Sequence, residues 1–150
     1  KIVADRFHVI RLMQHQCMLT YRELASQIKS NRGLLAVLRK RADKLSTKQR
    51  RRRDAFFEKH PAIKAIYHFQ QKLHQLLLYK AMNNEWCEKN IPKFLNMLKE
   101  LKNSPFKPLK ALGRTMDSWK NEIVRMWRFT KSNGITEGFH RKMKLIQRRA

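Results

Sequence analysis

Apolar residues recur at intervals of three and four along most of the chain, which is the spacing of an amphipathic helix. The clearest run begins at His60-Pro61, because proline suits the first position of a helix. It continues through Ile63, Ile66, Tyr67, Leu73, Leu76, Leu77 and Met82. The same periodicity, with its Pro, Gly and Asn punctuation, predicts helices over Phe7–Lys29, Pro61–Met82, Lys107–Phe129 and Thr136–Arg149.

The remaining segments predict shorter helices and one strand. Leu34 opens a short helix that runs into Arg39, and Ser46-Thr47 caps the next one. Pro92 is expected to kink or split a further helix near Asn90. Lys1–Asp5 is the only strand-like stretch, and it is too short to pair with itself. The expected fold is therefore mainly α, with six or seven helices and a strand stub.

The large positive charge of the chain predicts a polyanionic partner. Lys and Arg number 35 against 11 Asp and Glu, which leaves a formal net charge of +24. Nucleic acid is the first expectation and a membrane surface the second. Between Arg39 and Arg53 nine cations accompany a single acid, Asp43. A solvated helix face explains such a run, and so does contact with a DNA backbone; the density favours DNA. The candidates are Arg39, Arg41, Arg50, Arg51, Arg52 and Arg53.

Other chemistry has little support in the residues. Cys17 and Cys87 lack Cys-x-x-Cys spacing and are expected to be reduced core residues. The six histidines lack metal-ligand spacing, and no glycine-rich phosphate loop is present. Neither a signal peptide nor a membrane-spanning apolar run is found, so a cytoplasmic, nucleoid-associated protein is expected. The three tryptophans are expected to pack in a core.

The C-terminal segment carries the most specific pattern. Ser132-Asn-Gly134 signals a turn and helix start, and Glu137 then stands in the first turn. Cations follow on a neighbouring face at Arg141, Lys144 and Arg148. Glu137 has two interpretations: a carboxylate that complements the helix dipole, or a metal-binding carboxylate above a DNA-binding face.

The segment Asn133-Gly-Ile-Thr-Glu-Gly-Phe-His-Arg-Lys-Met-Lys-Leu-Ile-Gln-Arg-Arg-Ala150 resembles the N-G-x-x-E-G-x-N-x-x-I-K-x-I-x-R-x-A block of bacterial insertion-sequence transposases. These are the DDE transposases of the ISL-three family. Near the N-terminus, Asp5-Arg-Phe-His8 resembles the D-x-x-H signature of the same family. The chain departs from the common pattern at His140, where Asn is frequent, and at Met143, where Ile is usual.

The resemblance implies a ribonuclease-H-like catalytic core that holds two Mg²⁺ or Mn²⁺ ions with three carboxylates. Glu137 would be the third carboxylate, acting as catalytic residue and metal ligand, and the first two aspartates would precede Lys1. Asp5, His8, Asn133 and Gly138 would support the core as signature residues; for Asp5 a simple helix cap is the alternative. Arg141, Lys142, Lys144 and Arg148 would contact DNA.

The implied organisation has three parts. Residues 1–30 would be the end of a core strand plus a helix, 31–131 a basic α-helical insertion, and 132–150 a core helix with the acidic residue. The chain would then be a fragment that does not bind metal tightly and is inactive alone. The complete enzyme would cut and join DNA at transposon ends and target sites. It would work as a homo-oligomer in the transposition complex and without a membrane. The alternative function is a non-catalytic basic helical module that binds nucleic acid.

Overall fold

The computed structural model describes residues 6–79 and 82–128, and every regular element in these ranges is helical. Two short 3₁₀ helices, η1 (Ser26–Ser30) and η2 (Ala42–Lys44), accompany seven α-helices. These are α1 (Arg6–Leu24), α2 (Arg32–Arg39), α3 (Thr47–Lys59), α4 (Pro61–Leu78), α5 (Asn84–Lys102), α6 (Lys107–Ser118) and α7 (Lys120–Arg128). The prediction of a mainly α fold is confirmed.

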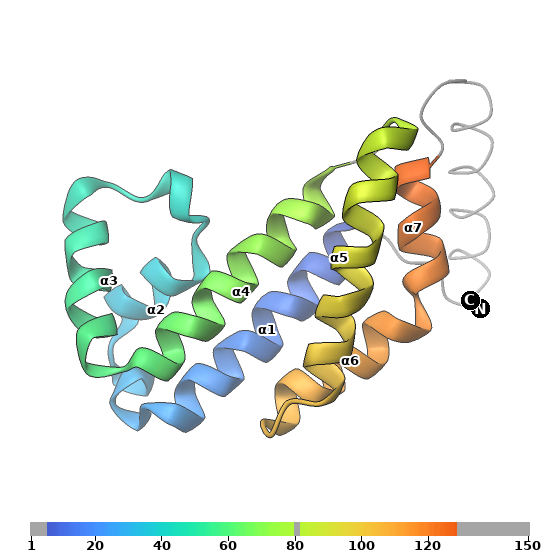
Figure 1. Ribbon diagram of the computed structural model, residues 1–150. Helices are drawn as coiled ribbons and strands as arrows, with labels where there is room; N and C mark the ends of the chain where they lie inside the picture. The colour runs from blue at the N-terminus through green and yellow to red at the C-terminus, as the bar shows by residue number, and fades with distance from the viewer. Residues whose placement is uncertain (1–5, 80–81, 129–150) are drawn as a thin grey trace.

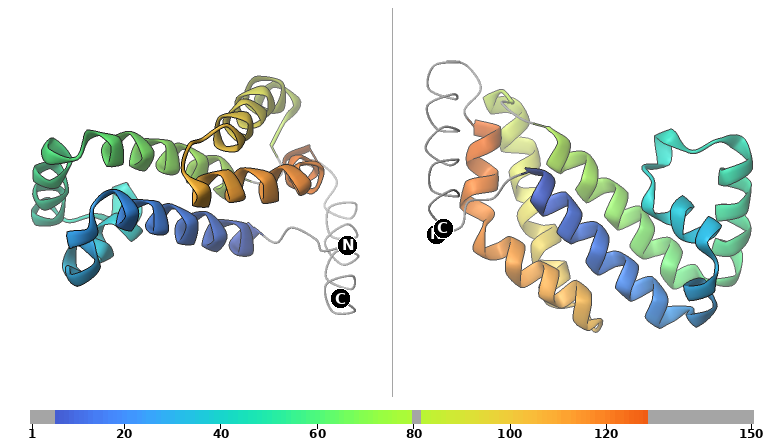
Figure 2. Two further views of the ribbon diagram at one scale, coloured as in Figure 1. Left: turned by 90° about the horizontal axis from the view of Figure 1, so that it is seen from below. Right: turned by 180° about the vertical axis from the view of Figure 1, so that it is seen from behind.

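Helices α1 and α4 lie side by side in opposite directions and form the centre of the molecule (Figure 1). Helix α6 packs against α1 and against α5, and α7 packs against α5. Helices α2 and α3 lie at the other end of the α1–α4 pair, away from α7, in all three views (Figures 1 and 2).

One continuous core joins these helices, because each contributes an apolar stripe to it. Trp127, Tyr21, Tyr67 and Phe94 are the largest side chains that are fully buried. Burying a large apolar side chain stabilises a fold by roughly 1.5–3 kcal/mol. Trp86 and Trp119 are partly buried against the same core. Cys17 and Cys87 are buried, as expected of core cysteines.

Trp127 fastens α7 to the connection between α4 and α5. Its indole Nε1 donates to the Tyr79 carbonyl at 3.1 Å, and its own carbonyl accepts from the Met82 amide at 2.8 Å. The ring stacks edge-on with Phe94, with 5.0 Å between ring centroids. The two described segments are therefore joined by hydrogen bonds as well as by apolar packing.

Several predicted boundaries are wrong. The first helix ends at Leu24, because Ala25 is extended (φ −143°, ψ 91°) and the chain then turns into η1. Helix α4 ends at Leu78, and Asn83 caps α5 instead of ending α4: its side chain accepts from the Trp86 amide at 2.8 Å. Pro92 does not split α5, which runs unbroken from Asn84 to Lys102.

The predicted helix Lys107–Phe129 is two helices, α6 and α7, with the break at Trp119. The Ser118 hydroxyl donates to the Thr115 carbonyl at 2.6 Å, a local bond that competes with helix continuation. The turn lets α7 pack against α5. The predicted strand 1–5 and the predicted helix 136–149 lie outside the described residues.

Candidate nucleic-acid interface

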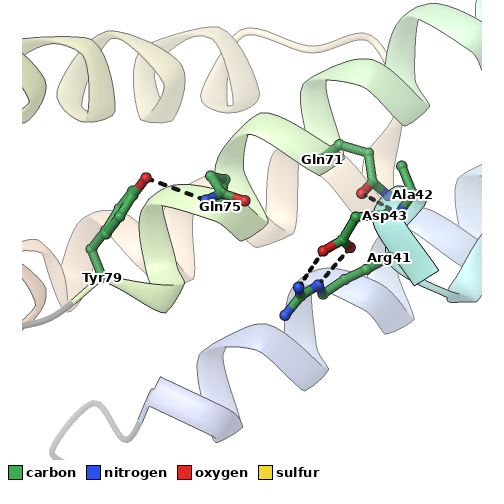
Figure 3. A network of polar contacts seen from close by, with 6 residues as sticks. All are labelled: Arg41, Ala42, Asp43, Gln71, Gln75 and Tyr79. Atoms are coloured by element: carbon green, nitrogen blue, oxygen red, sulfur yellow. Dashed lines mark hydrogen bonds and ion pairs between the residues drawn. The ribbon is translucent and has the colours of Figure 1, made fainter.

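The cation-rich run forms a distinct unit, the basic tip, which consists of α2, η2 and α3 (residues 32–59). It contacts both helices of the α1–α4 pair. On α1, Gln14 Nε2 donates to the Arg39 carbonyl at 3.5 Å. On α4, Gln71 Oε1 accepts from the Ala42 amide at 3.0 Å (Figure 3), and Tyr67 meets Phe57 with ring centroids 5.1 Å apart. The tip therefore has a defined position on the helical body.

Three of the predicted DNA-binding arginines are bound by other side chains of the protein. Arg41 makes a two-pronged ion pair with Asp43, with Nε–Oδ1 at 3.0 Å and Nη2–Oδ2 at 2.6 Å (Figure 3). These hydrogen bonds hold the pKa of the Asp43 carboxyl below its ordinary value. The one acid of the run is thus neutralised within the tip.

Arg52 links α3 to the start of α2. Its Nη2 donates to Asn31 Oδ1 at 2.6 Å, and the same oxygen caps α2 by accepting from the Leu34 amide at 3.1 Å. A Cβ at Gly33 would collide with the Arg52 guanidinium, so glycine leaves the space that this contact needs. Arg52 is therefore a positioning residue for the tip.

Arg53 lies against the helical body. Its guanidinium carbon is 5.6 Å from the centroid of the Tyr67 ring and 6.0 Å from that of Phe57, which is cation–π distance. Its Nε also contacts Asp54 Oδ1 at 3.1 Å, and only 16% of the side chain is exposed. Arg53 therefore fastens α3 to α4.

The remaining cations of the run from Arg39 to Arg53 are exposed to solvent. All six are exposed, and none makes an ion pair with a described residue. They are Arg39, Lys40, Lys44, Lys48, Arg50 and Arg51. Their positive charge is available to a polyanion, and a DNA backbone offers the phosphates that such a surface binds.

A second cationic surface differs from the tip in its electrostatics. A groove of about 360 Å³ between α5 and the α6–α7 junction is lined by Lys99, Lys102, Lys120 and Asp117, among others. Asp117 contacts Lys102 Nζ at 3.3 Å and Lys120 Nζ at 3.5 Å. Of these three lysines only Lys99 makes no ion pair with a described residue, whereas the six cations of the run Arg39–Arg53 named above make none.

Of the other predicted site residues, only His8 is described. It is exposed on the first turns of α1, and its ring centroid lies 5.5 Å from that of Trp119. Asp5, its predicted partner, lies outside the described residues, and so does Glu137. The same holds for Asn133, Gly138, Arg141, Lys142, Lys144 and Arg148.

The residues in ranges 6–79 and 82–128 bring together no three His, Cys, Asp or Glu side chains that could hold a metal ion. A proposed metal site therefore rests on Glu137 and not on this part of the chain. In the same ranges no helix combines the length and the apolar character that a bilayer crossing requires.

The sequence did not reveal which cations of the tip contact other residues of the protein and which are exposed and unpaired. Arg50, Arg51, Arg52 and Arg53 are neighbours in one helix and look alike in sequence. A helical wheel anchored on Phe56 and Phe57 would have placed Arg53 on the inner face. The partner of Arg52, Asn31, stands 21 residues away and no local signal connects the two.

Comparisons with known proteins agree with the two end motifs. A family model described as Transposase, for the DDE transposases of the ISL-three type, matches residues 1–150. No curated protein and no solved structure matches the chain. Since the family model covers the described helices together with the segments around Asp5 and Glu137, the chain belongs to the ISL-three family of DDE transposases.

Proposed function

We propose that this chain is part of a transposase that binds DNA at transposon ends and at target sites and cleaves and joins its strands. The observation that carries the proposal is the family match over residues 1–150, which spans the Asp5-x-x-His8 motif and the Asn133–Ala150 block. The described helices lie between these two blocks, and their exposed cations suit binding to DNA. In the transposition complex the protein would act as a homo-oligomer.

In this proposal Glu137 is the catalytic carboxylate of the chain and a ligand for Mg²⁺ or Mn²⁺, together with two aspartates that precede Lys1. Divalent ions of this kind, when bound by hard oxygen ligands, activate the attacking oxygen and stabilise the leaving oxygen at a phosphodiester. Asp5, His8, Asn133 and Gly138 would support the site. Arg141, Lys142, Lys144 and Arg148 would hold the phosphate backbone beside it.

The test is Glu137→Gln in the complete enzyme. Glutamine keeps the size of the side chain and removes the charge that holds the metal ion. We expect strand cleavage of a transposon-end duplex in Mg²⁺ to be lost, while DNA binding and thermal stability stay close to those of the parent. Glu88→Gln, an exposed carboxylate on α5, is the matched control and should cleave normally.

Two outcomes would contradict the proposal. Near-normal cleavage by Glu137→Gln, with stability lowered by only about 0.3–1 kcal/mol, would return Glu137 to the role of a helix-dipole residue. An absence of cleavage in the unaltered complete protein, with DNA binding intact, would favour the non-catalytic nucleic-acid-binding module.

A further inference from the structure

We propose that the basic tip is a sequence-independent clamp for the DNA backbone, in which the exposed cations bind phosphates and the anchored arginines only hold the helix in place. The inference rests on the proposed function and refines it. It divides the cation run into two classes with different roles. The phosphate-binding class is Arg39, Lys40, Lys44, Lys48, Arg50 and Arg51.

The charge of the tip supports DNA as the occupant. Six exposed cations lie within 13 residues of sequence, from position 39 to position 51, and the acid in that stretch, Asp43, is bound to Arg41. A surface with this excess of positive charge attracts a polyanion and releases the counterions of DNA when it binds. In the Lys99 groove Asp117 pairs with Lys102 and Lys120, which leaves fewer unpaired cations, so the groove is the weaker candidate.

The outer face of α3 presents two of these cations to solvent. Lys48, Arg51 and Ala55 are exposed at i, i+3 and i+7, which puts them on one face of the helix. None of these residues is tied to another part of the described chain, so their ends are free to reach phosphates.

Internal contacts hold this face rigid before DNA arrives. A capping box fixes the start of α3: the Gln49 amide donates to Ser46 Oγ at 3.2 Å, and the Ser46 amide donates to Gln49 Oε1 at 3.0 Å. Arg52 ties the helix to Asn31, and Arg53 ties it to the rings of Tyr67 and Phe57. A preorganised surface loses less conformational entropy on binding.

The position of the tip separates it from the chain ends. α3 adjoins α4 at His60, whereas Tyr79, at the other end of α4, is bonded to Trp127 near the end of α7. With 18 residues α4 is about 27 Å long. His8, near the start of α1, also contacts Trp119, the residue between α6 and α7. Both ends of the described chain therefore lie on the α7 side, at the opposite end of the α1–α4 pair from the tip (Figures 1 and 2).

The experiment compares two sets of four substitutions in the chain, each removing four positive charges. The tip set is Lys44→Gln, Lys48→Gln, Arg50→Gln and Arg51→Gln. The matched control set is Lys89→Gln, Lys93→Gln, Lys99→Gln and Lys110→Gln, all exposed positions on α5 and α6. Affinity for an arbitrary duplex of about 20 base pairs is followed by fluorescence anisotropy across a salt series.

For the parent chain, log K against log salt should have a slope near −5, since about six phosphates are neutralised. The tip set should reduce the magnitude of this slope by about 3–4, and the control set should leave it nearly unchanged. Arg52→Gln should lower the melting temperature, and at a temperature where it is folded it should keep the parent slope. Equal effects of the two quadruple sets, or a tip set with the parent slope, would overturn the proposal.

Two further measurements distinguish the DNA clamp from a binding surface for an acidic protein and from a part of the catalytic machinery. If the tip set loses binding to polyglutamate but not to duplex DNA, the occupant is an acidic protein and the DNA clamp is wrong. In the complete enzyme the tip set should raise the DNA concentration for half-maximal cleavage and leave the rate at saturating DNA unchanged, the reverse of the effect of Glu137→Gln. Loss of the saturated rate would place the tip in the catalytic machinery and overturn the clamp. Because affinity is measured without catalysis, the clamp can hold even if the assignment of Glu137 fails.

Discussion

The buried polar contact between Tyr21 and Gln70 joins the two central helices. The Tyr21 hydroxyl donates to Gln70 Oε1, and both side chains are almost completely inaccessible to solvent. Burial raises the pKa of the Tyr21 hydroxyl well above its ordinary value, so the group remains a neutral donor. An apolar residue in either position would leave the other polar group without its partner.

Tyr21→Phe should therefore lower the free energy of unfolding by about 1–3 kcal/mol, the cost of an unsatisfied buried acceptor. Adding Gln70→Leu should recover part of this loss, because the unpaired group is then gone. Urea denaturation measures both changes. The control is Tyr79→Phe, since the Tyr79 hydroxyl accepts from Gln75 Nε2 at 3.3 Å in an exposed setting (Figure 3) and should contribute little. Equal losses from Tyr21→Phe and Tyr79→Phe would contradict this account.

At the scale of elements, α5 and α6 approach each other closely at Gly113. A Cβ on Gly113 would stand 2.7 Å from Leu101 Cβ and 2.7 Å from the Lys102 amide nitrogen. Because the second of these atoms belongs to the backbone of α5, the two helices would have to separate. Gly113 therefore permits their close approach.

Gly113→Ala should destabilise the chain in spite of the better helix propensity of alanine. Overpacking costs about 1–3 kcal/mol, against a propensity gain of about 1 kcal/mol. The control is Ala111→Gly, at an exposed position of α6, which should cost about 0.5–1 kcal/mol through propensity alone. Thermal and urea unfolding check both variants. A stabilised Gly113→Ala variant would show that α6 moves away from α5 at no cost.

The existence of the helices could be read from the sequence because they carry apolar stripes and several begin at a capping residue or a proline. Ser46 and Pro61 begin helices where the rules for helix starts put them. The break at Trp119 could not be predicted, since the apolar period runs through it and no proline or glycine marks the turn. Asn83 was ambiguous for a similar reason, because the same residue type ends one helix and caps the next.

The candidate interface could be predicted only as a stretch of charge. Composition gives the number of cations between Arg39 and Arg53, and the helical period gives their spacing. Two of these arginines contact residues that are distant in sequence. Arg52 binds Asn31, and Arg53 lies against the ring of Tyr67. The assignment of Glu137 remains a prediction, since it lies outside the described residues.

At the scale of the whole molecule, a net charge of +24 is accompanied by few ion pairs among the described residues. Across the described ranges the ion pairs are Arg41–Asp43, Arg53–Asp54, Lys102–Asp117 and Lys120–Asp117. Folding brings the other cations closer together than they are in the unfolded chain. Their mutual repulsion opposes the folded state and is screened by salt.

Raising sodium chloride from about 50 to about 500 mM should therefore raise the melting temperature of the free chain, because the screening length shortens from roughly 14 to 4 Å. Differential scanning fluorimetry measures the shift. The quadruple tip variant, with four fewer charges, should melt higher than the parent in low salt and gain less from added salt. A melting temperature that falls with salt would mean that attractive ion pairs dominate the electrostatics.

The unpaired cations of the tip also have a consequence at the bench. A host-cell lysate contains RNA and fragments of genomic DNA. If the tip binds any phosphate backbone, as proposed, the protein will already hold nucleic acid when the cells are opened. Preparations made in dilute buffer should then contain bound nucleic acid. It would be seen as ultraviolet absorbance at 260 nm and as large particles of uneven size. Washing the protein in concentrated salt would remove the bound nucleic acid. The same salt also favours the folded chain, because it screens the repulsion between cations.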